Sequence, residues 1–264
     1  MIVTEGPLYT TQLQAGLGLV DETKELLDLW VAGMTASQLH QLALTSGRFP
    51  NVTARRLRNI VSECFAPRYL ISNGAPAQCL KQLSGSIPAA DLAQIMLIYT
   101  ARANPILGDF IRTVFWPRYA GGYADITNDD ARAFVERAID DGKTSIRWSE
   151  STVRRISAYL TGCCADYGLL SGGSRSARRI HPLRISSVAS AYLAYDLHLA
   201  GVGDNALLSH PDWQLFGLAK DDVLDELKRL SLKGHLIVQV AGDVVRISWK
   251  QSNMQELCDV LTQG

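Results

Sequence analysis

The chain has 264 residues, of which 47% are hydrophobic and 20% charged, and its 26 basic and 26 acidic side chains balance. This composition indicates a folded protein and argues against wholesale disorder. No apolar run reaches the ~20 residues that a membrane-spanning helix needs, and the first residues lack the basic start and apolar core of a signal peptide. We therefore expect a cytoplasmic protein without a membrane partner. Five cysteines without paired spacing fit a reducing compartment.

The charges sum to zero but are unevenly distributed along the chain. Residues 48–118 carry nine basic and three acidic side chains, and residues 143–184 carry eight and two, so each block has a net charge of +6. Residues 1–47, 119–142 and 185–264 each have a net charge of −4. Because salt screens a charge beyond ~8–10 Å, a local basic patch is what attracts phosphate. Zero net charge therefore leaves nucleic-acid binding open.

The first part of the chain predicts a series of amphipathic helices. An apolar face over residues 8–31 indicates a helix or helix pair. Thr35 is placed to cap a second helix over 36–45, and Thr53 to cap a third within 52–64. In the third helix, apolar residues recur at three- and four-residue spacing and form one buried stripe. A helix, a glycine-containing turn and a basic helix are typical of a helix-turn-helix, whose second helix enters the DNA major groove.

The third helix carries three arginines within four positions, with no acidic residue among them. Two of them face away from the apolar stripe, and Arg56 lies near its edge. Arginine suits bidentate contacts with phosphate or guanine, and Asn59 either contacts adenine or faces solvent. The alternative is a solvated helix face with surface salt bridges, each worth little. The predicted DNA-binding residues of this helix are Thr53, Arg55, Arg56, Arg58 and Asn59.

The middle of the chain is also predicted to be helical. Pro67 and residues 73–76 indicate a boundary or loop, after which residues 77–116 form helices around an apolar segment at 91–99. The last of these helices is expected to end near Trp116. Thr127 or the residue after it should cap the next helix, which acidic residues favour at its first turn.

A second basic helix follows, and its sequence repeats a pattern of the first. Thr152-Val-Arg-Arg-Ile repeats the pattern of Thr53-Ala-Arg-Arg-Leu, in a helix that starts at Ser149 or Ser151. A hairpin-like turn at 171–174 and an extended basic segment come next, which is the arrangement of a winged helix. The alternatives are that the helix arginines pair with Glu150, and that the basic segment is an ordinary loop. The predicted DNA-binding residues here are Arg154, Arg155, Arg175, Arg178, Arg179 and Arg184.

The last part of the chain predicts a third unit of this kind. Helices are expected over 187–200 and 220–232, followed by two strands, 235–240 and 244–249, joined by a turn typical of a β-hairpin. The second helix is acidic and would repel phosphate. This unit is therefore expected to bind protein or to be structural.

Motifs for catalysis or for ligand binding are missing from the sequence. The five histidines show no ligand pair at zinc spacing, and no glycine-rich segment has the pattern of a nucleotide-binding loop. No local signature supports a catalytic triad. We predict no enzymatic activity, no metal, no cofactor and no small-molecule substrate.

Several segments resemble the BrxA family of the BREX bacteriophage-exclusion systems. The resemblance rests on residues 9–19, 22–24 and 49–57 and on Arg68-Tyr69, and extends more loosely to the C-terminus. It implies a mostly helical fold likened to the NusB antitermination protein, DNA binding, no catalytic activity, and a part in phage defence beside a methyltransferase and ATPases.

Together these patterns predict a mainly α protein, a helical bundle with helix-turn-helix or winged-helix-like segments and small β-hairpin wings. The expected division is an N-terminal domain (1–76), a central domain (77–185) and a C-terminal winged-helix-like domain (186–264). The expected partners are double-stranded DNA, held mainly through arginine–phosphate contacts, and other BREX proteins. Two alternatives stay open: an RNA-binding, antitermination-like module and a protein adaptor that binds no nucleic acid.

Overall fold

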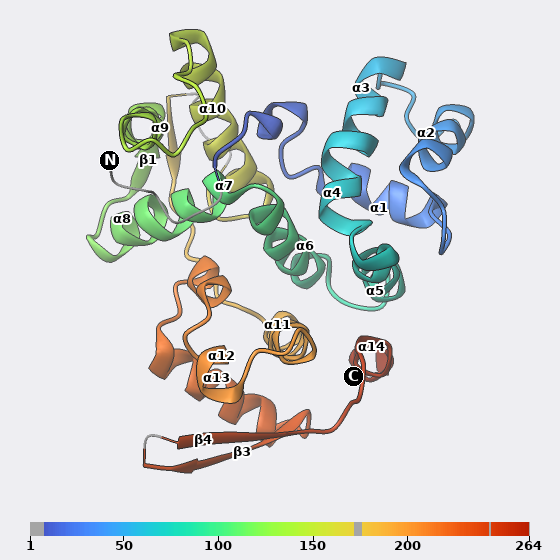
Figure 1. Ribbon diagram of the computed structural model, residues 1–264, viewed down its shortest axis with the longest axis vertical. Helices are drawn as coiled ribbons and strands as arrows, with labels where there is room; N and C mark the ends of the chain where they lie inside the picture. The colour runs from blue at the N-terminus through green and yellow to red at the C-terminus, as the bar shows by residue number, and fades with distance from the viewer. Residues whose placement is uncertain (1–7, 172–175, 243, 264) are drawn as a thin grey trace. The chain divides into compact units, whose positions relative to one another are not determined.

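The computed structural model describes residues 8–171, 176–242 and 244–263, apart from the side chains of residues 14 and 15. In these residues the chain is mainly helical, with two antiparallel pairs of short strands (Figure 1). The predicted mainly α fold with small antiparallel strand pairs is thereby confirmed. No helix among them is long and apolar enough to cross a bilayer.

Contacts within the chain group its residues into two compact units. Unit 1 comprises Met1–Gln78 and Tyr99–Leu183, and unit 2 comprises Cys79–Ile98 and Arg184–Gly264. The predicted boundary after residue 76 falls inside a helix, α5 (Ala75–Leu83). The helix α6 (Ala89–Ala103) likewise has residues in both units. The three-domain division stays a prediction.

Unit 1 contains short 3-10 and π-helical segments between its α-helices. Its elements are η1 (Gln12–Ala15), α1 (Val20–Leu29), α2 (Ala36–Thr45), α3 (Ala54–Asn59), η2 (Ile60–Phe65), α4 (Ala66–Tyr69), η3 (Ser72–Gly74), α7 (Pro105–Phe110), η4 (Ile111–Phe115), α8 (Trp116–Ala120), β1 (Asp125–Thr127), α9 (Asn128–Asp140), α10 (Glu150–Asp166) and β2 (Ala177–Arg179).

The helix starts predicted from capping residues are confirmed. The hydroxyls of Thr35, Thr53, Thr127 and Ser149 each accept a hydrogen bond from the backbone amide three residues later. Such a bond satisfies an amide that has no partner inside the helix. Between α2 and α3 the chain turns at Gly47, whose φ of 72° suits a residue without a β-carbon.

Two helices run further than predicted, through a proline. α3 continues through η2 into α4, and α7 continues through η4 into α8, so the ends expected near Pro67 and Trp116 were wrong. In each case a π-helical segment comes immediately before the short α-helix that contains the proline. The amide of Ala66 bonds to the carbonyl of Val61, and that of Trp116 to Ile111. Proline lacks an N–H and clashes with the carbonyl four residues back, and the wider π turn accommodates it.

These two helices share a sequence pattern that we call the Phe-x-Pro-Arg-Tyr repeat. Its first copy is residues 65–69 and its second copy is residues 115–119. Each copy starts at the last residue of a π-helical segment and ends in the α-helix that follows. The local sequence therefore produces the same interrupted helix twice in unit 1.

The remaining contacts of unit 1 join segments distant in sequence. η1 packs against both η2 and α10, and α9 packs against α10. Strand β2 pairs with β1 in the register Asp125↔Arg179, and the chain also forms an antiparallel bridge from Leu170 to Ile180. The predicted turn between the latter two residues is largely outside the described residues.

Unit 2 has the predicted order of two main helices followed by a hairpin. Besides its share of α5 and α6, its elements are α11 (Ser187–Leu199), α12 (Asp204–Leu207), η5 (Pro211–Phe216), α13 (Lys220–Leu232), β3 (Leu236–Ala241), β4 (Val244–Trp249) and α14 (Met254–Gln263). α11 packs against α13 and α14, and α13 packs against β3. The expected hairpin is confirmed as an antiparallel pair.

Candidate nucleic-acid interface

The first turns of α3 expose two of the predicted arginines. Thr53 caps the helix by accepting a bond from the amide of Arg56, so its hydroxyl has a structural role. Leu57 is buried and fixes which face of the helix points inward. Arg55 and Arg58 are exposed, and neither has a carboxylate partner among the described residues. Two guanidinium groups are thus available to an external anion.

Arg56 and Asn59 are less accessible than these two. Both are half-buried. Arg56 lines a pocket together with three acidic side chains, Asp21, Glu22 and Asp166. Arg56 thus has acidic surroundings, which Arg55 and Arg58 do not share in that pocket.

The start of α10 repeats the arrangement of α3. Ser149 caps the helix, and Arg154 and Arg155 are exposed without a carboxylate partner in the part of the chain that the structure describes. The predicted alternative partner, Glu150, instead lies 3.5 Å from Arg132 of α9. The two arginines of α10 are consequently left to solvent.

The basic segment after α10 is only partly brought to this region. Arg179 is exposed and Arg178 half-buried on strand β2. Arg175 lies outside the described residues. Arg184 belongs to unit 2, where its carbonyl accepts a bond from Gln94. The structure therefore places two of these four arginines in unit 1 with the helices α3 and α10.

Both basic helix starts belong to one compact unit. The short segment η1 links the two helices, because it packs against α10 and against η2, which continues α3. In the view of Figure 1 the helices α3 and α10 both begin at the top of unit 1 and run downward. Their exposed arginines thus come from the same end of two helices of one unit.

Six other arginines of the described residues differ from these four in having a carboxylate partner. Each of the following forms an ion pair with at least one carboxylate: Arg48, Arg112, Arg118, Arg132, Arg147 and Arg229. Exposure alone does not make the difference, because Arg147 is 79% exposed and still pairs with Asp140 at 3.1 Å.

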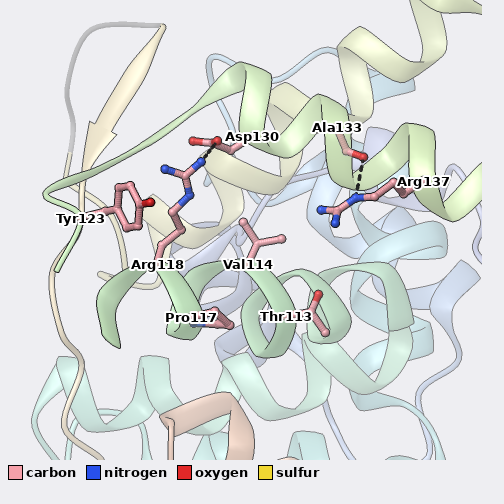
Figure 2. Close-up of a pocket in the computed structure, with 8 residues that line it drawn as sticks. All are labelled: Thr113, Val114, Pro117, Arg118, Tyr123, Asp130, Ala133 and Arg137. Atoms are coloured by element: carbon pink, nitrogen blue, oxygen red, sulfur yellow. Dashed lines mark hydrogen bonds and ion pairs between the residues drawn. The ribbon is translucent and has the colours of Figure 1, made fainter. Parts of the chain in front are cut away.

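A pocket of about 330 Å³ in unit 1 contains two further arginines that the sequence analysis did not single out. As Figure 2 shows, Arg118 reaches in from α8 and Arg137 from α9, and the Val114 side chain projects between them. Arg118 pairs with Asp130 and lies 4.4 Å from the ring centroid of Tyr123. The Phe-x-Pro-Arg-Tyr repeat is the signal that could have found this arginine.

Arg137 has a different set of contacts in the same pocket. Its Nε donates to the carbonyl of Ala133, one turn earlier in α9, at 3.2 Å. Among the residues that the structure describes, its guanidinium has no carboxylate partner. The pocket is therefore open to an anion, but the ion pair of Arg118 with Asp130 offsets part of its positive charge.

A comparison with known families decides the assignment. A family model described as BrxA matches residues 7–196. The chain belongs to the BrxA family. The resemblance recognised in residues 9–57 is thereby confirmed, and membership makes the chain a protein associated with BREX phage defence.

Comparison with solved structures supports the fold of this BrxA-family chain. A crystal structure of an uncharacterized protein from Magnetospirillum magneticum is similar with a TM-score of 0.58 and 16% sequence identity, covering 73% of this chain and 95% of that one. At this identity the likeness concerns the fold alone. None of the curated proteins compared with the chain matches it.

Metal binding finds no support in the described side chains of this BrxA-family chain. Among them, no three His, Cys, Asp or Glu residues gather in a way that could hold an ion. The five thiols are free and buried. Burial raises the pKa of the Cys163 thiol to about 12, so this group stays protonated at neutral pH.

Proposed function

We propose that the chain is a non-catalytic accessory protein of a BREX system that binds double-stranded DNA in the cytoplasm, with other BREX components as partners. The observation that supports DNA binding most is the pair of helix starts, α3 and α10, that expose arginines without carboxylate partners. Guanidinium groups left to solvent on one unit suit phosphates, which supply most of the sequence-independent affinity for DNA.

The roles within the proposed interface follow from accessibility. Arg55, Arg58, Arg154 and Arg155 contact phosphates, and Arg179 extends the contact along strand β2. Thr53 holds the start of α3 rather than binding DNA through its hydroxyl. The half-buried Arg56, Asn59 and Arg178 contribute at the margin of the interface, and Arg175 and Arg184 remain proposed contacts.

The experiment compares matched pairs of arginines by fluorescence anisotropy with a labelled duplex. We expect that Arg55→Ala with Arg58→Ala, and separately Arg154→Ala with Arg155→Ala, weakens binding at every salt concentration. Each lost phosphate contact should lower the slope of log K against log salt by ~0.9. The matched control changes Arg132 and Arg147 of unit 1, whose side chains are 43% and 79% exposed but are paired with carboxylates.

Unchanged affinity in both double variants, with normal unfolding transitions, would show that these helices do not bind DNA. Competition by double-stranded RNA tests the antitermination-like alternative, because equal displacement by RNA and DNA would favour it. An adaptor would retain no duplex at moderate salt and would co-purify with other defence components.

A further inference from the structure

The two edges of the β-hairpin in unit 2 differ in whether their outward-pointing backbone amides have hydrogen-bond partners. β3 and β4 pair in the register Ile237↔Ser248, Gln239↔Arg246 and Ala241↔Val244. The hairpin lies beyond residue 196, where the match to the BrxA family ends. The family match therefore says nothing about the role of the hairpin, and we infer that role from its structure.

Side chains from α12 close the outer edge of β4. The amide of Val245 donates to Oδ1 of Asn205 at 3.2 Å, and the amide of Ile247 donates to Oδ2 of Asp204 at 2.9 Å. Amides alternate in direction along a strand. Because these two point outward, the alternate residues Val244, Arg246 and Ser248 are the ones that bond to β3.

The same alternation leaves the outer edge of β3 open. Ile237, Gln239 and Ala241 direct their backbone groups toward β4, so those of Val238 and Val240 point away from the hairpin. In the described part of the chain neither of these two residues has another hydrogen-bond partner. Among the described residues, the outward amides of β4 thus have hydrogen-bond partners and those of β3 do not.

The open edge also lacks the usual features that prevent strand pairing. Charged residues, proline and bulges commonly protect an edge strand. The sequence of β3 is Leu-Ile-Val-Gln-Val-Ala, without charge or proline. Ile237 and Val240 are 48% and 49% exposed. A long, uncharged and partly apolar edge of this kind favours the addition of another strand.

We propose that β3 pairs in antiparallel fashion with β3 of a second copy of this chain, about a twofold axis at Gln239. This register places Val238 opposite Val240 of the second copy, so two such pairs form. Each exchanges two N–H···O bonds, about four in all. The two hairpins become one four-stranded sheet.

A second copy is the occupant that suits the chemistry of this edge. Two uncharged strands meet without like-charge repulsion, and Ile237 lies opposite Ala241 of the other copy. The two Gln239 side chains face each other and can exchange amide hydrogen bonds. A strongly charged peptide would find no opposite charge on β3. Strand pairing alone buries less than the ~1,200 Å² of a stable interface, so dimerisation depends on concentration.

Cross-linking through Gln239→Cys tests the register directly. Opposite residues in a pair without hydrogen bonds have Cα atoms ~4.5 Å apart, within the range of disulfides. Under mild oxidation by glutathione disulfide, two thiols lose two protons and two electrons, an S–S bond forms, and the glutathione disulfide is reduced to two thiols. We expect a covalent dimer on a non-reducing gel. Ser248→Cys is the matched control, because it is exposed on the same face of β4.

Sedimentation velocity over a wide range of protein concentration tests the association without a cross-link. We expect the unmodified chain to dimerise on concentration, and Gln239→Lys to weaken dimerisation about tenfold because it sets like charges opposite each other. Ser248→Lys adds the same charge beside the closed edge and should leave dimerisation unchanged. A chain that stays monomeric throughout, an equal effect of the two lysines, or equal cross-linking of the two cysteines would overturn the proposal.

Discussion

The two copies of the Phe-x-Pro-Arg-Tyr repeat have the same backbone and opposite surroundings. In the first copy Arg68 is 2% exposed, and its guanidinium donates to the carbonyls of Gly18 and Leu17 at 3.2 and 3.0 Å. In the second copy the side chain of Arg118 is 32% exposed and pairs with Asp130. The neighbours that come from elsewhere in the chain, rather than the repeat itself, decide what the arginine does.

The loop that contains Leu17 and Gly18 packs against Arg68 of the first copy, and several residues hold this loop in place. The carbonyl of Gly18 also accepts a bond from the hydroxyl of Tyr167 at 3.0 Å, and the amide of Gly18 donates to Asp166 at 2.8 Å. The second copy instead borders the open pocket of Figure 2. The first copy is therefore a structural centre of unit 1, whereas the second lies at its surface.

The largest expected difference between the two copies is in the stability that is lost when the arginine of each copy is replaced by alanine. Arg68→Ala leaves a cavity and a buried carbonyl without a donor, which should lower the free energy of unfolding by about 2–4 kcal/mol. Arg118→Ala breaks a partly buried ion pair at the rim of an open pocket and should cost about 1 kcal/mol. Urea denaturation of both variants measures the difference. Similar losses in the two would show that the copies are equivalent.

A smaller difference is expected from adding a methyl group beside each copy. A β-carbon at Gly18 would lie 2.6 Å from Cβ of Asp166, an atom fixed to the backbone of α10, so the loop must shift. Gly18→Ala should destabilise the chain by about 1–3 kcal/mol. At Gly121 the nearest atom is 3.1 Å away on the exposed ring of Tyr123, which can move. We expect less than about 1 kcal/mol for Gly121→Ala, as judged by thermal unfolding, and a larger loss there would contradict the comparison.

The smallest effect should be a pH dependence at the first copy. Burial raises the pKa of the Asp166 carboxyl, which the bond from the amide of Gly18 only partly opposes. A raised pKa in the folded state favours the protonated form, so the contribution of Asp166 to stability falls as the pH rises through that pKa. Asp166→Asn should therefore be slightly more stable than the parent at neutral pH, with the difference lost in acid. A stability gap that does not change with pH would contradict this account.

Helices with local start signals could be predicted from the sequence, and long-range pairings could not. Capping depends on residues three positions apart, so Thr35, Thr53 and Thr127 could be identified without a structure. The pairing of β1 with β2 joins three residues to three others beyond two helices, and so short a strand carries no periodic signal. The continuation of α3 through Pro67 was missed because proline usually ends a helix.

The candidate interface shows the same division. The sequence identified Arg55, Arg58 and the pair on α10, because helical spacing places them opposite a buried stripe. It could not show that Arg56 lies beside acids of the N-terminal segment and of the end of α10. Nor could it show that Arg184 belongs to the other unit. Both outcomes depend on contacts between distant parts of the chain.

The side chains of Asp204 and Asn205 also determine how far an assembly of these chains could grow. A sheet with two free edges can add copies at both sides without limit, as fibrils do, whereas a sheet with a single free edge is complete after one addition. By satisfying the amides of Val245 and Ile247, two short side chains of α12 make any such association self-terminating.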